Sequence, residues 1–148
     1  MYSEAGRELT QKVAGGARDL RIELPHSSHA PAIARAAIDE LSLHLDENRH
    51  EDLKLLVSEV VTNSVRHSPE VKGGRIQLEL MSRGGSVRAE IRDSGSGFSF
   101  VPTPRRFSID QVSGWGLDIV GQLSDSWGIS TKDGGVCVWF EIRNRPGP

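Results

Sequence analysis

The apolar residues of this 148-residue chain change their spacing several times, and the order of these spacings limits what the chain can fold into. The two-residue period typical of a half-buried strand begins at Arg18 and ends at Pro25. Four later runs share this period, and they cover residues 76–80, 87–91, 127–131 and 136–142. The connection Ser82–Gly85 contains two glycines and predicts a hairpin between the second and third strands.

Two longer segments have the three- to four-residue period of helices. The first starts at Pro31, where a missing N–H group is tolerated, and its apolar positions are Ile33, Ala37, Ile38, Leu41 and Leu45. The second stops at Ser68-Pro69, and its buried positions are Leu53, Leu56, Val57, Val60, Val61 and Ser64. With a short third helix at 117–123, this order predicts an α+β fold, a two-layer sandwich with helices on one face of a mostly antiparallel sheet.

We expect one domain over residues 18–143, a flexible N-terminal arm at 1–17 and a disordered tail at 144–148. The net charge of -2 gives no reason to expect direct nucleic-acid binding or attraction to an anionic membrane. A single cysteine excludes an internal disulfide and favours a reducing compartment. No apolar stretch reaches the roughly 18 residues that span a bilayer, so the cytoplasm is the expected location.

The stretch from 94 to 116 interrupts the regular periods. It contains four glycines and two prolines, too many backbone breakers for a core element, and we interpret it as a functional loop. At its start, Asp93 ends a predicted strand and precedes Gly95 and Gly97, which places a carboxylate beside backbone that a ligand can approach closely. Taken alone, these residues are more typical of an Asp-initiated turn.

At the other end of this stretch, Gly114-Trp115-Gly116-Leu117 leads into the short helix. Backbone N–H groups at a helix N-terminus attract anions, so a phosphate is the natural ligand, and a glycine hinge is the simpler alternative. The dinucleotide-binding glycine motif does not fit, because Ile119 occupies the third glycine position. The chain also lacks the glycine-rich lysine motif of P-loop proteins.

A polar stripe follows the second predicted helix. Glu59, Asn63 and His67 are four residues apart, which aligns a carboxylate, an amide and an imidazole on one side of the helix. Most polar stripes of this kind are solvated helix faces, and the spacing alone does not distinguish the two interpretations.

Taken together, the three segments resemble the N, G1 and G2 boxes of the GHKL ATPases, the superfamily that contains gyrase, Hsp90, MutL and the histidine kinases. Residues 59–67 are similar to the N box, 93–98 to G1 and 114–117 to G2, in the family's order. The resemblance extends from Arg18 to Arg143 and implies the GHKL (Bergerat) type of ATP-binding sandwich.

Within that superfamily, the small size and the Asp125-Ser126-Trp127-Gly128 stretch resemble the bacterial anti-sigma factor serine/threonine kinases. The resemblance implies a homodimer that sequesters a sigma factor. It also implies that the protein uses ATP and Mg²⁺ to phosphorylate a serine or threonine of an anti-sigma factor antagonist. Two alternatives stay open: a module that acts by sequestration alone, and a detached histidine-kinase catalytic domain, for which no phospho-acceptor helix is found before Arg18.

The resemblance assigns roles to the matching polar residues. Asp93 would accept a hydrogen bond from the adenine amino group and disfavour guanine, whose carbonyl would face the carboxylate. Asn63 would give its side-chain oxygen to Mg²⁺, which prefers oxygen ligands. Glu59 would act as the general base toward the incoming hydroxyl, the catalytic role in phosphoryl transfer.

The expected ATP-binding set is completed by His67, Gly95, Gly97, Phe98, Arg105, Gly114, Trp115, Gly116 and Leu117. The glycines would let backbone N–H groups approach the nucleotide, and the leucine would begin the helix that faces the phosphates. The histidine either contacts a phosphate or caps its helix, and the arginine, with Arg106, either offsets γ-phosphate charge or stays solvated. Each aromatic ring either walls the adenine or is buried under the loop.

Several other residues are assigned to structural roles. Trp127, Trp139 and Cys137 are predicted to lie in the core. His26 and His29 lack the third and fourth ligands that a zinc site needs, so a zinc site is not expected.

Overall fold

The computed structural model describes residues 12–14, 17–41, 43–67, 75–93, 117–132 and 135–145. The strands are β1 (Lys12–Ala14), β2 (Ala17–Pro25), β3 (Arg75–Arg83), β4 (Ser86–Asp93), β5 (Ser126–Lys132) and β6 (Gly135–Arg143). The helices are α1 (Ala30–Asp39), α2 (Glu47–His67) and α4 (Leu117–Leu123).

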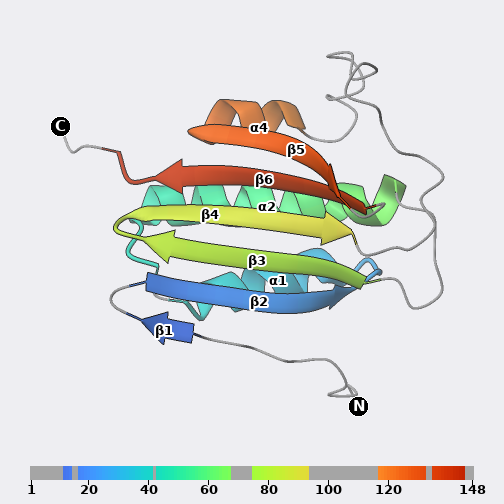
Figure 1. The fold of residues 1–148 in the computed structure, drawn as a ribbon, viewed down its shortest axis with the longest axis horizontal. Coiled ribbons are helices and arrows are strands. Elements are labelled where there is room, and N and C mark those ends of the chain that lie inside the picture. The colour runs from blue at the N-terminus through green and yellow to red at the C-terminus, as the bar shows by residue number, and fades with distance from the viewer. Residues whose placement is uncertain are drawn as a thin grey trace.

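One sheet joins the strands in the order β1-β2-β3-β4-β6-β5, and every described neighbouring pair is antiparallel. The helices lie on one face of this sheet (Figure 1). Because strand side chains alternate between faces, β4 directs Val87, Ala89 and Ile91 to the helices. The α+β two-layer sandwich predicted from the periodicity is confirmed.

The hairpin between β3 and β4 follows the sequence prediction. Its two turn residues, Gly84 and Gly85, have φ angles of 53° and 79°. Positive φ at both central positions is the geometry that suits the right-handed twist of a two-residue hairpin, and glycine adopts it without strain.

The connection between α1 and α2 differs from the prediction, because α1 ends at Asp39 and does not extend to Leu45. His44 has a φ of 55°, which no right-handed helix accommodates. Its carbonyl accepts a 2.8 Å hydrogen bond from the side chain of Asn144, which in turn accepts one of 2.9 Å from the backbone of Asp46. Asn144, expected in a disordered tail, therefore holds this connection in place.

The N-terminal arm also contains structure that the sequence pattern did not predict. Lys12–Ala14 pairs with Ala17–Asp19, so the sheet gains a short edge strand and β2 begins one residue before Arg18. Three residues are too few to show an alternating period, so their pairing depends on the neighbouring strand.

The prediction of a core position is wrong for both tryptophans. Trp139 alternates with Val138 and Phe140, so it lies on the face without helices, where the guanidinium of Arg88 stacks 4.2 Å from its ring centre. Trp127 lies on the edge strand β5 and is 36% exposed. Cys137 is buried as predicted.

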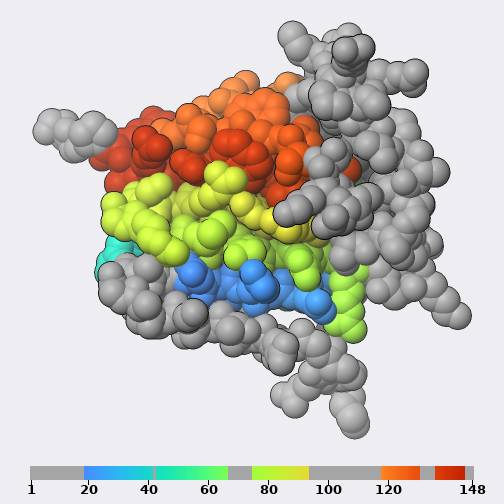
Figure 2. All heavy atoms as spheres, in the orientation of Figure 1, coloured from blue at the N-terminus to red at the C-terminus, as the bar shows by residue number. Residues whose placement is uncertain are grey.

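The face without helices carries charged side chains arranged in cross-strand ion pairs. Figure 2 shows this face of the molecule. Pairs such as Arg75 with Glu23, at 2.8 Å, and Arg83 with Asp19, at 2.7 Å, join neighbouring strands. Exposed pairs of this kind add little stability, but they explain why this face stays polar. Among the described residues no helix is long and apolar enough to cross a membrane.

Candidate functional site

Three segments that are far apart in the sequence meet at one end of the sandwich. The helix α2 ends there at His67, β4 ends there at Asp93, and α4 begins there at Leu117 (Figure 1). Because α2 packs against both β4 and α4, these ends belong to one region of the helical layer. The fold therefore brings together the described ends of the three segments, namely the end of α2, Asp93 and the start of α4.

Asp93 lies on the buried side of the sheet. It continues the inward series of Val87, Ala89 and Ile91, and only 6% of the residue is exposed. A carboxylate on the apolar side of a sheet is costly to bury, and such a position is typical of a group retained for binding. The backbone register alone determines this placement, since each step of two residues returns to the same face.

Asn63 is equally buried, with 7% of the residue exposed. It follows Val60 by three residues in α2, so it lies beside the stripe that packs on the sheet. A solvated helix face, the common alternative for a polar stripe, is therefore wrong for Asn63. Glu59, one turn earlier in the same helix, is half-buried.

Neighbouring polar side chains of α2 are satisfied within the helical layer. Thr62 donates to the carbonyl of Ser58 at 2.7 Å, and Ser64 donates to the carbonyl of Val60 at 3.1 Å. Arg35 of α1 donates to the Ser58 hydroxyl at 2.7 Å. These hydrogen bonds position α2 itself.

The remaining residues of the predicted site are not placed by the structure. Gly95, Gly97, Phe98, Arg105, Gly114, Trp115 and Gly116 lie outside the described residues, as does Arg106. The side chains of His67 and Leu117 are also outside the described part, although both backbones belong to helices. Their roles stay predictions.

Asn63 carries in this region an oxygen ligand of the kind that hard cations prefer. In the described ranges no three histidine, cysteine or acidic side chains gather in a way that could hold a metal ion. A magnesium ion needs only one or two protein oxygens when a bound phosphate supplies others, and the Asn63 amide offers such an oxygen.

A comparison with known protein families gives a match that covers most of the fold and the elements of the candidate site. The Histidine kinase-like ATPase domain family matches residues 25–142, a segment that includes all three elements of the site. This chain belongs to the histidine kinase-like ATPase family.

Relatives of this histidine kinase-like ATPase include anti-sigma factors. An anti-sigma F factor of Clostridium botulinum (strain Eklund 17B / Type B) is 37% identical over 86 residues, which cover 56% of this chain. That match spans 60% of the relative's length. An anti-sigma F factor of Clostridium kluyveri (strain ATCC 8527) is 32% identical over 120 residues, or 76% of this chain and 84% of the relative. The chain therefore belongs with the anti-sigma factors of the family.

A solved structure supports the architecture. The crystal structure of the RsbU and RsbW domains of Rv1364c from Mycobacterium tuberculosis superposes with a TM-score of 0.64 and 24% sequence identity. The match covers 86% of this chain and 33% of that one. It confirms the α+β sandwich of the GHKL type as the fold of this histidine kinase-like ATPase.

Proposed function

We propose that this histidine kinase-like ATPase binds ATP with Mg²⁺ at the end of the sandwich where α2 and β4 finish and α4 begins. The observation that carries the proposal is the burial of two polar side chains there, Asp93 at 6% exposure and Asn63 at 7%. Membership in an ATPase family gives the nucleotide as the ligand. The pocket would be completed by His67, by Leu117 and by the seven predicted ATP-binding residues that lie between positions 95 and 116.

The buried carboxylate would select the base. Asp93 would accept a hydrogen bond from the amino group of adenine, whereas the carbonyl of guanine would face the same carboxylate without a proton to share. Asn63 would offer its amide oxygen to Mg²⁺, whose chemistry is to bridge the phosphates and offset their charge. Glu59, half-buried and one turn before Asn63, would accept the proton of the attacking hydroxyl.

At the level of partners, we propose an anti-sigma factor with serine/threonine kinase activity. It would sequester a sigma factor in the cytoplasm as a homodimer and phosphorylate an antagonist of that sequestration. The names of the clostridial relatives support the sigma factor as a partner. The half-buried Glu59 beside a buried amide supports phosphoryl transfer, because the acceptor hydroxyl needs a base near the γ-phosphate.

Calorimetric titration of Mg²⁺-ATP into the purified chain tests the nucleotide site. We expect ATP to bind, GTP to bind poorly, and Asp93→Asn to weaken ATP binding about 10- to 150-fold, the range for losing a hydrogen bond to a charged group. Asp19→Asn is the matched control, since Asp19 pairs with Arg83 on the face without helices. Equal ATP affinity of Asp93→Asn and the parent chain would refute the assignment of Asp93.

Phosphate transfer to an antagonist protein, followed by mass spectrometry, tests the kinase step. Glu59→Gln should lower the rate by about 100-fold or more while ATP affinity is retained, because a general base acts only in the reaction. Glu51→Gln, which changes an exposed glutamate of the same helix, should transfer phosphate normally. A parent chain that holds a sigma factor but transfers no phosphate would favour sequestration alone.

A further inference from the structure

Arg49, in the first turn of α2, is among the largest fully buried side chains of the described residues, with 2% exposure. Sequence analysis did not single it out, although it lies four residues before the buried Leu53 and so continues the apolar stripe of the helix. An arginine in such a position needs partners for most of its five N–H groups.

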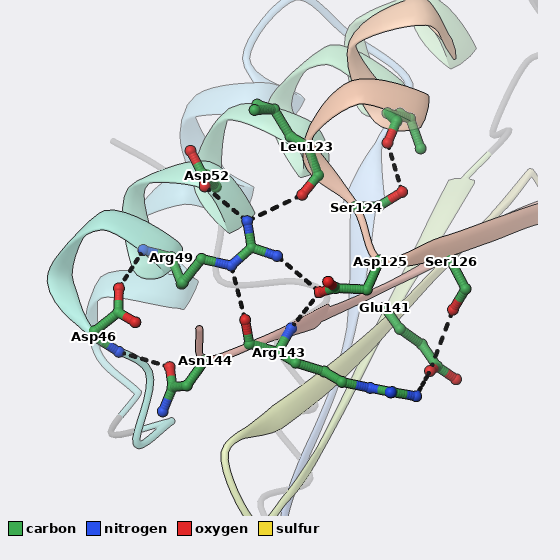
Figure 3. Close-up of polar contacts among 11 residues, drawn as sticks. Asp46, Arg49, Asp52, Leu123, Ser124, Asp125, Ser126, Glu141, Arg143 and Asn144 are labelled. Carbon is green, nitrogen blue, oxygen red and sulfur yellow. Dashed lines mark hydrogen bonds and ion pairs between the residues drawn. The ribbon is translucent and has the colours of Figure 1, made fainter. Parts of the chain in front are cut away.

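The partners come from three separate parts of the chain (Figure 3). Nη1 donates to the carbonyl of Leu123 and to the Asp52 carboxylate, both at 3.0 Å. Nη2 donates to the Asp125 carboxylate at 2.8 Å, and Nε donates to the carbonyl of Arg143 at 2.8 Å. One guanidinium thus joins the start of α2 to the last residue of α4 and to the end of β6.

Asp125 closes this cluster from the opposite side. The carboxylate oxygen that accepts from Arg49 also accepts a 2.7 Å hydrogen bond from the backbone N–H of Arg143. The backbone N–H of Asp125 donates to the carbonyl of Glu141 at 2.9 Å. The turn between α4 and β5 is therefore tied to both Arg49 and β6.

Few of the described side chains of α4 are buried. It has seven residues, far fewer than a helix needs to persist by itself. Val120 is its fully buried residue, while Ile119 and Leu123 are partly buried against the core. Arg49 adds a cation and a donor at the C-terminal carbonyls, where the helix dipole favours positive charge. The position of α4 thus depends strongly on Arg49.

We propose that Arg49 is a positioning residue for the nucleotide site and acts through α4. The inference rests on the proposed function. Arg49 lies at the opposite end of the sandwich from the site, and Asn63 follows it by 14 residues in α2, about 20 Å along the helix. The same helix therefore carries Asn63 and, through Arg49, holds the C-terminal end of α4, whose first residue is Leu117.

The test compares Mg²⁺-ATP affinity in variants that keep the positive charge. Arg49→Lys retains the charge but loses the planar fork that reaches three acceptor groups at once, and we expect about 10-fold weaker ATP binding. Arg83→Lys is the matched control, because Arg83 pairs with Asp19 on the face without helices. Its affinity should stay within about 2-fold of the parent. All titrations are made below the unfolding transition of each variant.

A second variant approaches the same contact from its acceptor. Asp125→Asn keeps the shape of a side chain that is 39% exposed but removes its charge, and it should weaken ATP binding in the same direction. If Arg49 and Asp125 act as one unit, the loss of ATP affinity in the double variant should be smaller than the two single losses multiplied together. If Arg49→Lys does not fold, Asp125→Asn decides the question alone.

Hydrogen exchange of the α4 amides without nucleotide separates the possible failures. The exchange of residues 120–123 should accelerate in Arg49→Lys but not in Arg83→Lys. A parent chain that binds no ATP would overturn the proposed function and this role with it. A parent chain that binds ATP while Arg49→Lys and Asp125→Asn bind it with the parent affinity would overturn only the role of Arg49.

Discussion

At the scale of single residues, Gly128 in β5 shows how one missing side chain permits a packing arrangement. A Cβ atom at this position would lie 2.7 Å from both Cζ2 and Nε1 of Trp139. That separation is shorter than packed carbon atoms tolerate, so the indole would have to leave its place against Arg88. The glycine is required by the neighbouring strand.

We therefore expect Gly128→Ala to lower the free energy of unfolding by about 1–3 kcal/mol, the usual cost of overpacking. Urea denaturation followed by circular dichroism measures this change. In a Trp139→Ala background the same substitution should cost much less, because the clashing ring is absent. An equal cost in both backgrounds would show that the ring is not the obstacle.

At the scale of elements, α4 contains a glycine with the opposite expectation. A Cβ atom at Gly121 would lie 3.5 Å from Nε1 of Trp127, an ordinary contact distance. Alanine favours the helical conformation over glycine, so Gly121→Ala should raise the free energy of unfolding by about 0.5–1 kcal/mol. Thermal unfolding compares the two chains. A loss of stability would mean that Trp127 lies closer to α4 than described.

A second element-scale prediction concerns the link between α1 and α2. The Asp39 carboxylate at the end of α1 lies 3.0 Å from Nζ of Lys54 and 3.2 Å from Nε2 of His50, both in α2. The hydrogen bond from Lys54, followed by that from His50, lowers the pKa of Asp39 below its ordinary value of 3.8. A lowered pKa stabilises the fold above that value, and the contribution is lost as the pH falls through the lowered pKa.

In Asp39→Asn the free energy of unfolding should therefore fall less steeply than in the parent chain as the pH drops below about 4. Urea midpoints measured across this pH range compare the variant with the parent chain. Glu40→Gln, which changes the next residue in the chain, is the matched control. It should lose stability on acidification as steeply as the parent chain. If Asp39→Asn loses stability on acidification as steeply as the parent chain, this link does not contribute to the stability of the fold.

At the scale of the whole molecule, the sandwich has one face covered by helices and one face of paired charges. The sole cysteine, Cys137, is buried on the charged face. Burial, reinforced by the negative charge of Glu90, raises the pKa of this thiol above its ordinary value. The thiolate that reacts with labelling reagents is therefore scarce in the folded protein.

We expect a thiol reagent at about pH 8 to label the folded chain far more slowly than a free cysteine, whose pKa is about 8.5. Labelling should accelerate through the urea transition measured by circular dichroism, because only unfolding frees the thiol. With a single cysteine the signal has one source. Rapid labelling in native buffer would indicate that β6 opens without global unfolding.

Much of the molecule could be predicted from local patterns. The alternating runs identified five strands, and the longer period identified the helices, because burial of one side of an element repeats along the chain with the geometry of that element. The same alternation places Asp93 inward beside Ile91 and Trp139 outward beside Phe140, so the error over Trp139 lay in judging by residue type.

Other features depended on contacts between distant residues. The connection after α1 depends on His44, whose positive φ is held by a hydrogen bond from Asn144, 100 residues later. The burial of Arg49 is supported by carbonyls 74 and 94 residues away. By itself the sequence determined most of the elements, the edge strand β1 excepted, and that Glu59, Asn63 and Asp93 belong to recognisable motifs. Only the tertiary structure decided which ends of the helices and strands meet and which groups pair with the buried Arg49. A local period shows that one side of an element is buried but not what covers it.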